Sequence, residues 1–343
     1  MKVCNIRNLF KPAVFVLIFA AVMMVLCQMF IPKTSDSEGG MTNPNARGFY
    51  GEPRNSIDLV VMGDSNAYCA YSPMVIWEKY GIPSYVAAEG NQTIVGAINL
   101  LDEMLKCQSP KLLVFDVNML WSGDSNVQRI EDCINSMLGQ AVPVVKYHDR
   151  WKNLQLMDSF KEKNYTFRSK TRGQRLGRCV KPYTGDDLMK KTDDRESIPW
   201  ITKYFFEKLL KRCECNDIQV LLIETPTATS WTYARHVTME KYAEKNHLKF
   251  IDFNMIDGKY KIDWKEDTKD GGMHMNVYGA KKVTAYLGKY IAENYTFDNK
   301  KANVEYSDWN VCYKEYKRYV RKGKIYLPND DQIENGIKDD EHE

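Results

Sequence analysis

Ser65 follows an apolar stretch, residues 59–62, and a glycine, a pattern typical of a strand that ends in a sharp turn. Gly63 can adopt the tight backbone angles of such a turn, and residues 67–80 can form a helix after it. Ser65 would then lie at a helix N-terminus, where unpaired N–H groups stabilise negative charge on a nearby oxygen. A serine nucleophile and the oxyanion that it creates need this environment. The run therefore predicts a nucleophilic serine.

A serine nucleophile needs a general base, and the five histidines of the chain are the candidates. His274 is the best placed, because it lies in a glycine-containing loop, residues 270–276, that leads into a final amphipathic helix. We interpret the other four as solvated side chains in a polar insert, in or after a surface helix, and in the acidic tail: His148, His236, His247 and His342.

The order of these motifs resembles the SGNH, or GDSL-type, hydrolase superfamily, in which a serine in a GDS turn comes early and an Asp-x-x-His motif comes late. Two further blocks can be matched: a glycine block at Gly90 and, written here as Asp-Val-Asn, the family's Gly-x-Asn block at Asn118. The resemblance covers about residues 56–125 and 215–292. Four blocks in the family's order are more specific than any one of them.

The resemblance implies a role for each matched residue. Ser65 attacks an ester carbonyl, His274 accepts its proton, and Asp270 orients the imidazole. The N–H of Ser65, the N–H of Gly90 and the side-chain amide of Asn118 bind the oxyanion. Three polar residues beside these positions are candidate substrate-binding residues: Asp64, Asn66 and Asn91.

The chain departs from the family pattern at two places. Asp116 stands where the family has a glycine, and its carboxylate could either oppose charge in the oxyanion hole or turn away and cap the backbone. The spacing from Asp270 to His274 is one residue longer than usual, with two glycines that could absorb the extra residue. Asp263 and Asp267 remain alternative partners for the imidazole.

The same four letters, Gly-Asp-Ser-Asn, recur at residues 123–126. The first copy follows the leading predicted strand, whereas the second lies beyond the third strand and opens a polar, helix-like segment. Asp and Ser at such a position cap the first turn of a helix. We therefore predict that Ser65 is the nucleophile and that Ser125 is a helix cap.

The N-terminal segment has the pattern of a signal anchor. Basic residues precede an uncharged run, residues 12–32, whose 21 residues match the ~20 that cross a bilayer as a helix. Because the basic flank comes first, the positive-inside rule predicts a cytoplasmic N-terminus and an extracellular chain after Lys33. A cleaved signal peptide is the rival interpretation, although the apolar stretch is long for one. Residues 35–51 are rich in Gly, Asn, Ser and Pro and are predicted to be a flexible tether.

Apolar strand patterns alternate with helical ones along the rest of the chain. The predicted strands are residues 58–62, 84–88, 112–116, 218–223 and 248–252. The predicted helices are residues 67–80, 94–107, 200–212, 232–246 and 276–292. This alternation predicts an α/β fold, a flavodoxin-like three-layer α/β/α domain with a mostly parallel five-stranded sheet, preceded by one transmembrane helix. The site residues then follow strand C-termini, the edge at which such sheets bind ligands.

We divide the chain into four parts. They are the cytoplasmic flank and transmembrane anchor (1–32), an extracellular linker (33–55), the SGNH-like domain (56–298) with an insert (119–200), and a C-terminal helical extension with an acidic tail (299–343). Aromatic residues at near-helical spacing in the extension are expected to pack on the domain surface: Tyr306, Trp309, Tyr313, Tyr316 and Tyr319.

Charge and cysteine content limit the partners that the chain is expected to bind. A net charge of +3 gives no general attraction to nucleic acid, so we expect no nucleic-acid partner. One basic patch, residues 161–181, is either a solvated face or a groove for an anionic polymer such as teichoic acid or an acidic glycan. The nine cysteines show no zinc-ligand spacing and are interpreted mostly as free thiols. We expect neither a metal nor a cofactor.

These patterns predict a membrane-anchored, extracellular SGNH-like serine esterase or O-acyltransferase that acts on acyl esters of a cell-envelope polymer. The substrate would be an acylated glycan, a teichoic acid or another envelope polymer. The anchored arrangement also resembles the SGNH protein of teichoic acid D-alanylation and the acetyltransferases of exopolysaccharide export. The alternative is a non-catalytic SGNH-fold protein that binds or helps assemble such a polymer. Asp116 and the long spacing before His274 favour that alternative.

Overall fold

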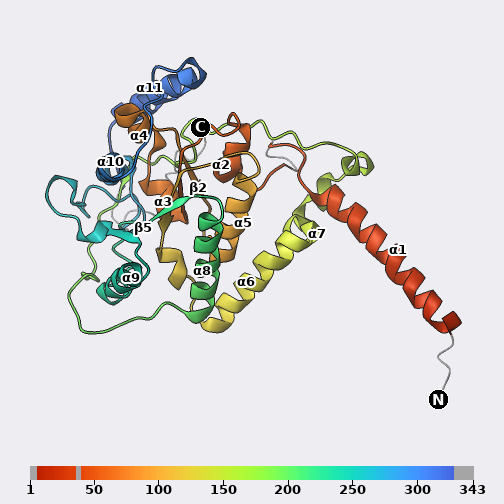
Figure 1. The fold of residues 1–343 in the computed structure, drawn as a ribbon. Coiled ribbons are helices and arrows are strands. Elements are labelled where there is room, and N and C mark those ends of the chain that lie inside the picture. The colour runs from red at the N-terminus through yellow and green to blue at the C-terminus, as the bar shows by residue number, and fades with distance from the viewer. Residues whose placement is uncertain (1–5, 36–39, 328–343) are drawn as a thin grey trace. The chain divides into compact units, whose positions relative to one another are not determined.

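The computed structural model describes residues 6–35 and 40–327 (Figure 1). The predicted acidic tail, residues 330–343, and His342 within it lie outside the described residues. The chain forms two compact units, Met1–Pro44 with Ile134–Phe167, and Asn45–Cys133 with Arg168–Glu343. The predicted insert is therefore divided between the two units.

Five parallel strands form the central sheet of the second unit, in the order β2-β1-β3-β5-β6. They are β1 (Leu59–Gly63), β2 (Ser84–Ala88), β3 (Leu112–Asp116), β5 (Gln219–Glu224) and β6 (Lys249–Asp252). The first three are buried along their whole length because helices cover both faces, which explains their continuous apolar sequences. The predicted α/β, flavodoxin-like fold is confirmed.

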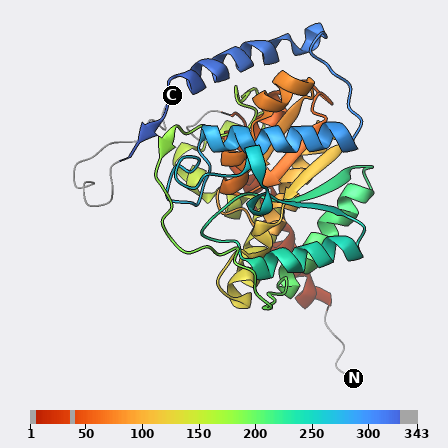
Figure 2. The ribbon, with the colours of Figure 1, turned by 90° about the vertical axis from the view of Figure 1, so that its left-hand side faces the viewer.

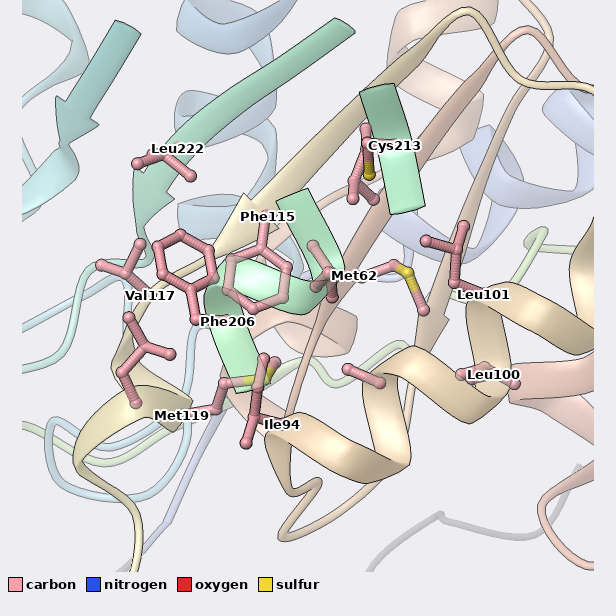
Figure 3. Close-up of a cluster of buried hydrophobic side chains, with 14 of the residues drawn as sticks. Met62, Ile94, Leu100, Leu101, Phe115, Val117, Met119, Phe206, Cys213 and Leu222 are labelled. Carbon is pink, nitrogen blue, oxygen red and sulfur yellow. The ribbon is translucent and has the colours of Figure 1, made fainter. Parts of the chain in front are cut away.

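Three helices cover one face of the sheet: α5 (Ile94–Met104), α8 (Trp200–Glu214) and α9 (Tyr233–Lys245). Figure 3 shows Met62 and Phe115 from the sheet packed against Phe206 of α8. The rings of Phe115 and Phe206 stack with their centroids 5.2 Å apart. These helices pack on the sheet and contain none of the predicted site residues.

The other face is covered by α3 (Ser65–Ala70), α4 (Pro73–Tyr80) and α10 (Val277–Asn294). Figure 2 shows α10, in blue, lying across this face. A further helix, α11 (Ser307–Arg321), packs on α4, where the rings of Trp77 and Trp309 lie 5.2 Å apart. The expected packing of the C-terminal aromatic residues on the domain is confirmed.

Two local predictions are wrong. The helix predicted at residues 67–80 is interrupted, since Pro73 has no N–H and disfavours helical backbone in the residue before it. The helix that carries Ser65 is therefore only six residues long. The predicted tether at residues 35–51 is folded in its second half, as α2 (Pro44–Arg47) and η1 (Gly48–Gly51), and Phe49 is fully buried in the core.

The first unit is built around α1 (Ile6–Phe30). Its stretch Phe10–Phe30 has 21 residues and is long and apolar enough to cross a membrane. Three short elements of the same unit pack against α1: α7 (Pro143–Lys146), η3 (His148–Asn153) and η4 (Leu156–Ser159).

The remaining described elements are α6 (Asn126–Ala141), η2 (Asn118–Trp121), η5 (Phe253–Met255), η6 (Gly258–Tyr260), η7 (Val304–Tyr306), and the paired strands β4 (Cys179–Val180) and β7 (Ile325–Tyr326).

Candidate active site

Ser65 follows a tight turn in which position 63 has room only for glycine. A Cβ atom at Gly63 would approach the Cβ of Ala67 to 2.4 Å and the Cβ of Asp116 to 2.9 Å, closer than real side chains come. The side chain of Asp64 then caps α3 by accepting a hydrogen bond from the N–H of Asn66 at 2.8 Å. Strand β1 therefore ends in a rigid turn that presents Ser65 at the carboxyl edge of the sheet.

Three predicted residues form a continuous hydrogen-bonded relay. Ser65 Oγ lies 2.8 Å from His274 Nε2, and His274 Nδ1 lies 2.5 Å from Asp270 Oδ2. A carboxylate can only accept at neutral pH, so Nδ1 carries the proton and Nε2 is left to accept from the serine hydroxyl. This is the tautomer that a general base acting on Ser65 requires.

The longer Asp270-to-His274 spacing is compatible with this contact. Gly271 and Gly272 have φ of +79° and +95°, values that L side chains rarely adopt, and they fold the extra residue into the loop. The backbone N–H of His274 also donates to Asp270 Oδ1 at 2.8 Å, and the N–H of Gly272 donates to Thr268 Oγ1 at 2.7 Å. Asp270 thus holds both the main chain and the ring of His274.

The two alternative carboxylates bind elsewhere. Asp267 is buried and pairs with Lys282 at 2.5 Å, and it also accepts the N–H of Asp263 at 2.8 Å. Asp263 in turn accepts the N–H of Lys265 at 3.0 Å. Of the three candidates, only Asp270 contacts the imidazole. Burial alone would raise the pKa of Asp270, but its hydrogen bonds from His274 and the charge of that ring lower the pKa below its ordinary value.

The two predicted oxyanion donors flank the serine turn on neighbouring strands. Gly90 follows β2 in an exposed turn, where an added Cβ would meet only the Tyr68 hydroxyl, at 3.9 Å. Asn118 follows β3, is 7% exposed, and donates one amide hydrogen to Ser230 Oγ at 3.1 Å. Because an amide nitrogen carries two hydrogens, Asn118 keeps a second one for an oxyanion.

Both oxygens of the Asp116 carboxylate accept hydrogen bonds from neighbouring groups. Its Oδ1 accepts the backbone N–H of Asn118 at 3.1 Å, and its Oδ2 accepts the hydroxyl of Thr225 at 2.5 Å. Burial, with the charge of nearby Asp64 adding to it, raises the pKa of Asp116 to about 7. Of the two orientations considered from the sequence, the structure has the backbone cap. Asp116 therefore holds the backbone of Asn118.

Two further carboxyl groups lie near Asp116 under the site. Glu224 ends β5, is fully buried, and has no hydrogen-bond partner for either oxygen among the described residues. Burial and the nearby charges of Asp116 and Asp252 raise the pKa of Glu224 well above its ordinary value. Burial also raises the pKa of Asp64.

The expected substrate-binding residues are only partly accessible. Asp64 is used as the cap of α3, and Asn66 is buried with 6% exposure, so neither offers its side chain to a substrate. Asn91 is exposed, with a positive φ of 51°. Tyr68 was not predicted from the sequence as a site residue. Its ring centre lies 4.7 Å from the guanidinium of Arg175, which belongs to the predicted basic patch at residues 161–181.

The remaining histidines and the second GDSN copy lie elsewhere. Ser125 caps α6 by accepting the N–H of Gln128 at 3.1 Å, in agreement with the sequence interpretation. The prediction that His236 is solvated is wrong, because its Nδ1 lies 2.8 Å from Asp252 Oδ2 and its side chain is only 13% exposed. Among the described residues, no group of three or more His, Cys, Asp or Glu side chains could hold a metal ion.

No family model matches the chain, and no curated protein is similar to it. Solved structures similar to it include a GDSL-like lipase from Bacteroides thetaiotaomicron VPI-5482, with 14% identity and a TM-score of 0.36 over 69% of this chain and 89% of that one. The psychrotrophic esterase EstA from Pseudoalteromonas sp. has 12% identity and a TM-score of 0.37, over 69% and 97%. A lipase/acylhydrolase from Enterococcus faecalis has 10% identity and a TM-score of 0.33, over 70% and 98%. Identities and TM-scores this low carry no functional argument, and the fold and the site rest on the chain's own strand order and hydrogen bonds.

Proposed function

We propose that this chain is a membrane-anchored, extracellular serine esterase or O-acyltransferase of the SGNH type that acts on acyl esters of a cell-envelope polymer. The observation that carries the proposal is the relay from Ser65 through His274 to Asp270, with contacts of 2.8 and 2.5 Å. A nucleophile, a base and an orienting carboxylate in this order are the groups that acyl transfer needs.

The relay supports a two-step reaction. Ser65 Oγ attacks the ester carbonyl while His274 Nε2 takes its proton. The negative charge that develops on the carbonyl oxygen is bound by the N–H groups of Ser65 and Gly90 and by the Asn118 amide. His274 then protonates the departing alcohol, which leaves an acyl group on Ser65. Water or a sugar hydroxyl, deprotonated by His274, attacks this acyl-enzyme and regenerates the free serine.

A cavity beside the relay supports an anionic polymer as substrate. It has a volume of about 360 Å³, and three cationic side chains line it together with Asp270: Arg178, Lys181 and Lys269. Such a set suits phosphate or carboxylate groups on the alcohol side of the ester. The apolar stretch of α1 supports attachment to the membrane that such polymers surround.

The test is labelling of the purified full chain in detergent with a fluorophosphonate, followed by mapping of the adduct. We expect an adduct on Ser65 that is lost in Ser65→Ala and kept in the matched variant Ser125→Ala. A folded chain that takes no label, or one labelled at Ser125, would contradict the proposal.

The two sequence features that favoured a non-catalytic protein are compatible with catalysis, because Asp116 accepts the N–H of Asn118 and His274, despite the longer loop, contacts Ser65.

The substrate class is tested with a matched pair of esters, an O-acyl glycerol phosphate and the same O-acyl glycerol without phosphate. We expect a lower KM for the phosphate ester, and Lys181→Gln should remove that preference while the exposed control Lys245→Gln keeps it. Equal KM values for the two esters would show that the cavity does not select an anion.

A further inference from the structure

A segment far along the chain closes the end of the apolar helix. Arg150 Nη1 donates to the carbonyl oxygens of Met29 and Phe30, at 3.0 and 2.6 Å, and so caps the C-terminal end of α1. The hydroxyl of Tyr165 donates to the carbonyl of Pro32 at 2.6 Å. We call residues 143–165 the collar; its elements lie in the same compact unit as α1, and Figure 1 shows α7 beside that end of the helix.

The collar exposes large apolar side chains beside this helix end. Trp151 is 65% exposed, Met157 62% and Phe160 80%, although each lies within a few residues of a contact with α1. Phe160 and Met157 are held together by a hydrogen bond from the N–H of Phe160 to the carbonyl of Met157, at 3.1 Å. Large apolar side chains exposed along one short segment indicate an interaction surface.

Cationic side chains neighbour the apolar ones in the sequence of the collar, and Lys152 Nζ lies 5.5 Å from the centre of the Trp151 ring. Lys152 and Lys163 are exposed, and Lys161 pairs with Asp158 at 2.9 Å. Burial, helped by the nearby charges of Lys163 and Arg150, lowers the pKa of Lys33, which lies shortly after the end of α1. A surface that mixes aromatic residues with lysines complements the boundary between acyl chains and anionic phosphates.

The level of the collar follows from the helix. At ~1.5 Å per residue, the 21 residues of Phe10–Phe30 span about 31 Å, close to the thickness of a bilayer core. If Phe10 enters one boundary, Phe30 ends at the other, and Arg150 holds the collar at that end. Trp151, one residue further on, then lies at headgroup level, where tryptophan is enriched in membrane proteins.

We propose that the collar is a lipid-binding surface, with Trp151, Met157 and Phe160 inserted at the acyl boundary of the leaflet next to Phe30 and its lysines on anionic lipid phosphates. The inference goes beyond the proposed catalysis and shares only its premise that α1 spans the membrane. A second protein as the occupant is less well supported, because the helix end already fixes the collar at the bilayer surface.

The experiment uses the tryptophans of the full chain reconstituted into vesicles of phosphatidylcholine and phosphatidylglycerol. Of the seven tryptophans, Trp151 is the only one in the sequence ranges of the first unit, and α1 contains none. Lipids brominated near the headgroup end of the acyl chain quench only tryptophans that reach them. We expect quenching in the parent chain that is lost in Trp151→Phe. The matched variant Trp200→Phe, which removes a side chain of similar exposure, 61%, on α8, should keep it.

Quenching that is the same in Trp151→Phe as in the parent would overturn the collar. Extraction of the same vesicles at alkaline pH tests the anchor separately. A chain that resists extraction but shows no Trp151-dependent quenching keeps the anchor and loses the collar. If the chain is extracted although Trp151-dependent quenching was present, the anchor hypothesis is wrong. The collar would then remain supported as a peripheral lipid-binding surface. Fluorophosphonate labelling of Ser65 is independent of all these outcomes.

Discussion

Asp116→Asn should change the pH dependence of the free energy of unfolding, because the Asp116 carboxyl is buried. Its pKa rises from 3.8 to about 7 on folding, so the folded chain holds the proton more tightly than the unfolded one. Stability that depends on this proton is complete below about pH 4 and is lost as the pH rises to 7. At ~1.36 kcal/mol for each pKa unit, about three units correspond to a loss of about 4 kcal/mol.

The asparagine cannot ionise and therefore avoids this loss. It gives up one good acceptor for Thr225, at a cost of about 1 kcal/mol. Relative to the parent, Asp116→Asn should be less stable by about 1 kcal/mol near pH 4 and more stable by about 3 kcal/mol near pH 8. Urea unfolding of the full chain in detergent, followed across this pH range, measures the difference. A difference that stays constant with pH would refute the reasoning.

Activity separates the position of Asp116 from its charge. Asn at position 116 can still accept the N–H of Asn118, so kcat/KM on an activated ester should stay within about tenfold of the parent. Asp116→Gly, which restores the family residue, removes that acceptor, and we expect it to lower kcat/KM. A gain in turnover for Asp116→Gly would mean that the carboxylate does oppose charge in the oxyanion hole.

Three further changes test other parts of the site. Asp270→Asn should lower kcat/KM by roughly 10³–10⁴-fold through loss of the correct tautomer of His274, and a loss below tenfold in steady-state ester hydrolysis would argue against the relay. Ser230→Ala frees the Asn118 amide and should lower kcat with little change in KM; an effect on KM alone would contradict an oxyanion role. Burial alone would lower the pKa of His236, but the hydrogen bond and charge of Asp252 outweigh burial and raise that pKa above 6.5. The stabilisation of the fold by this pair is therefore complete below pH 6.5 and is lost as the pH rises through the folded pKa. His236→Gln should therefore be less stable by about 1 kcal/mol near pH 6, with a smaller difference near pH 9, as followed by thermal unfolding.

The sheet could be predicted closely because its strands carry their own signals. Residues 84–88 and 112–116 form strands with the predicted bounds, since buried parallel strands read as short apolar runs that end at polar residues. The meeting of Ser65 and His274 followed from the same logic, as both come after strand ends on one edge. The orientation of Asp116 could not be predicted, because it depends on the hydroxyl of Thr225 on another strand.

The errors arose where tertiary contacts override local composition. The stretch at residues 44–51 has a turn-like composition, yet Phe49 fills a core position and Arg47 is buried against Glu89 and Glu103. His236 looked solvated in its helix because its partner is supplied by β6. The break before Pro73 was the one error that the sequence itself could have prevented.

The relay joins the first loop of the sheet to its last, across 209 residues of chain. At ~5–20 residues per second, synthesis of that interval takes roughly 10–40 s, during which the serine exists without its base. If the proposed function holds, a nascent chain cannot turn over esters while it is being made, and neither can a fragment that stops short of His274. Under the proposed function, activity would begin only when β6, the loop that carries His274 and α10 have docked, so completion of the fold would itself be the step that activates the nucleophile.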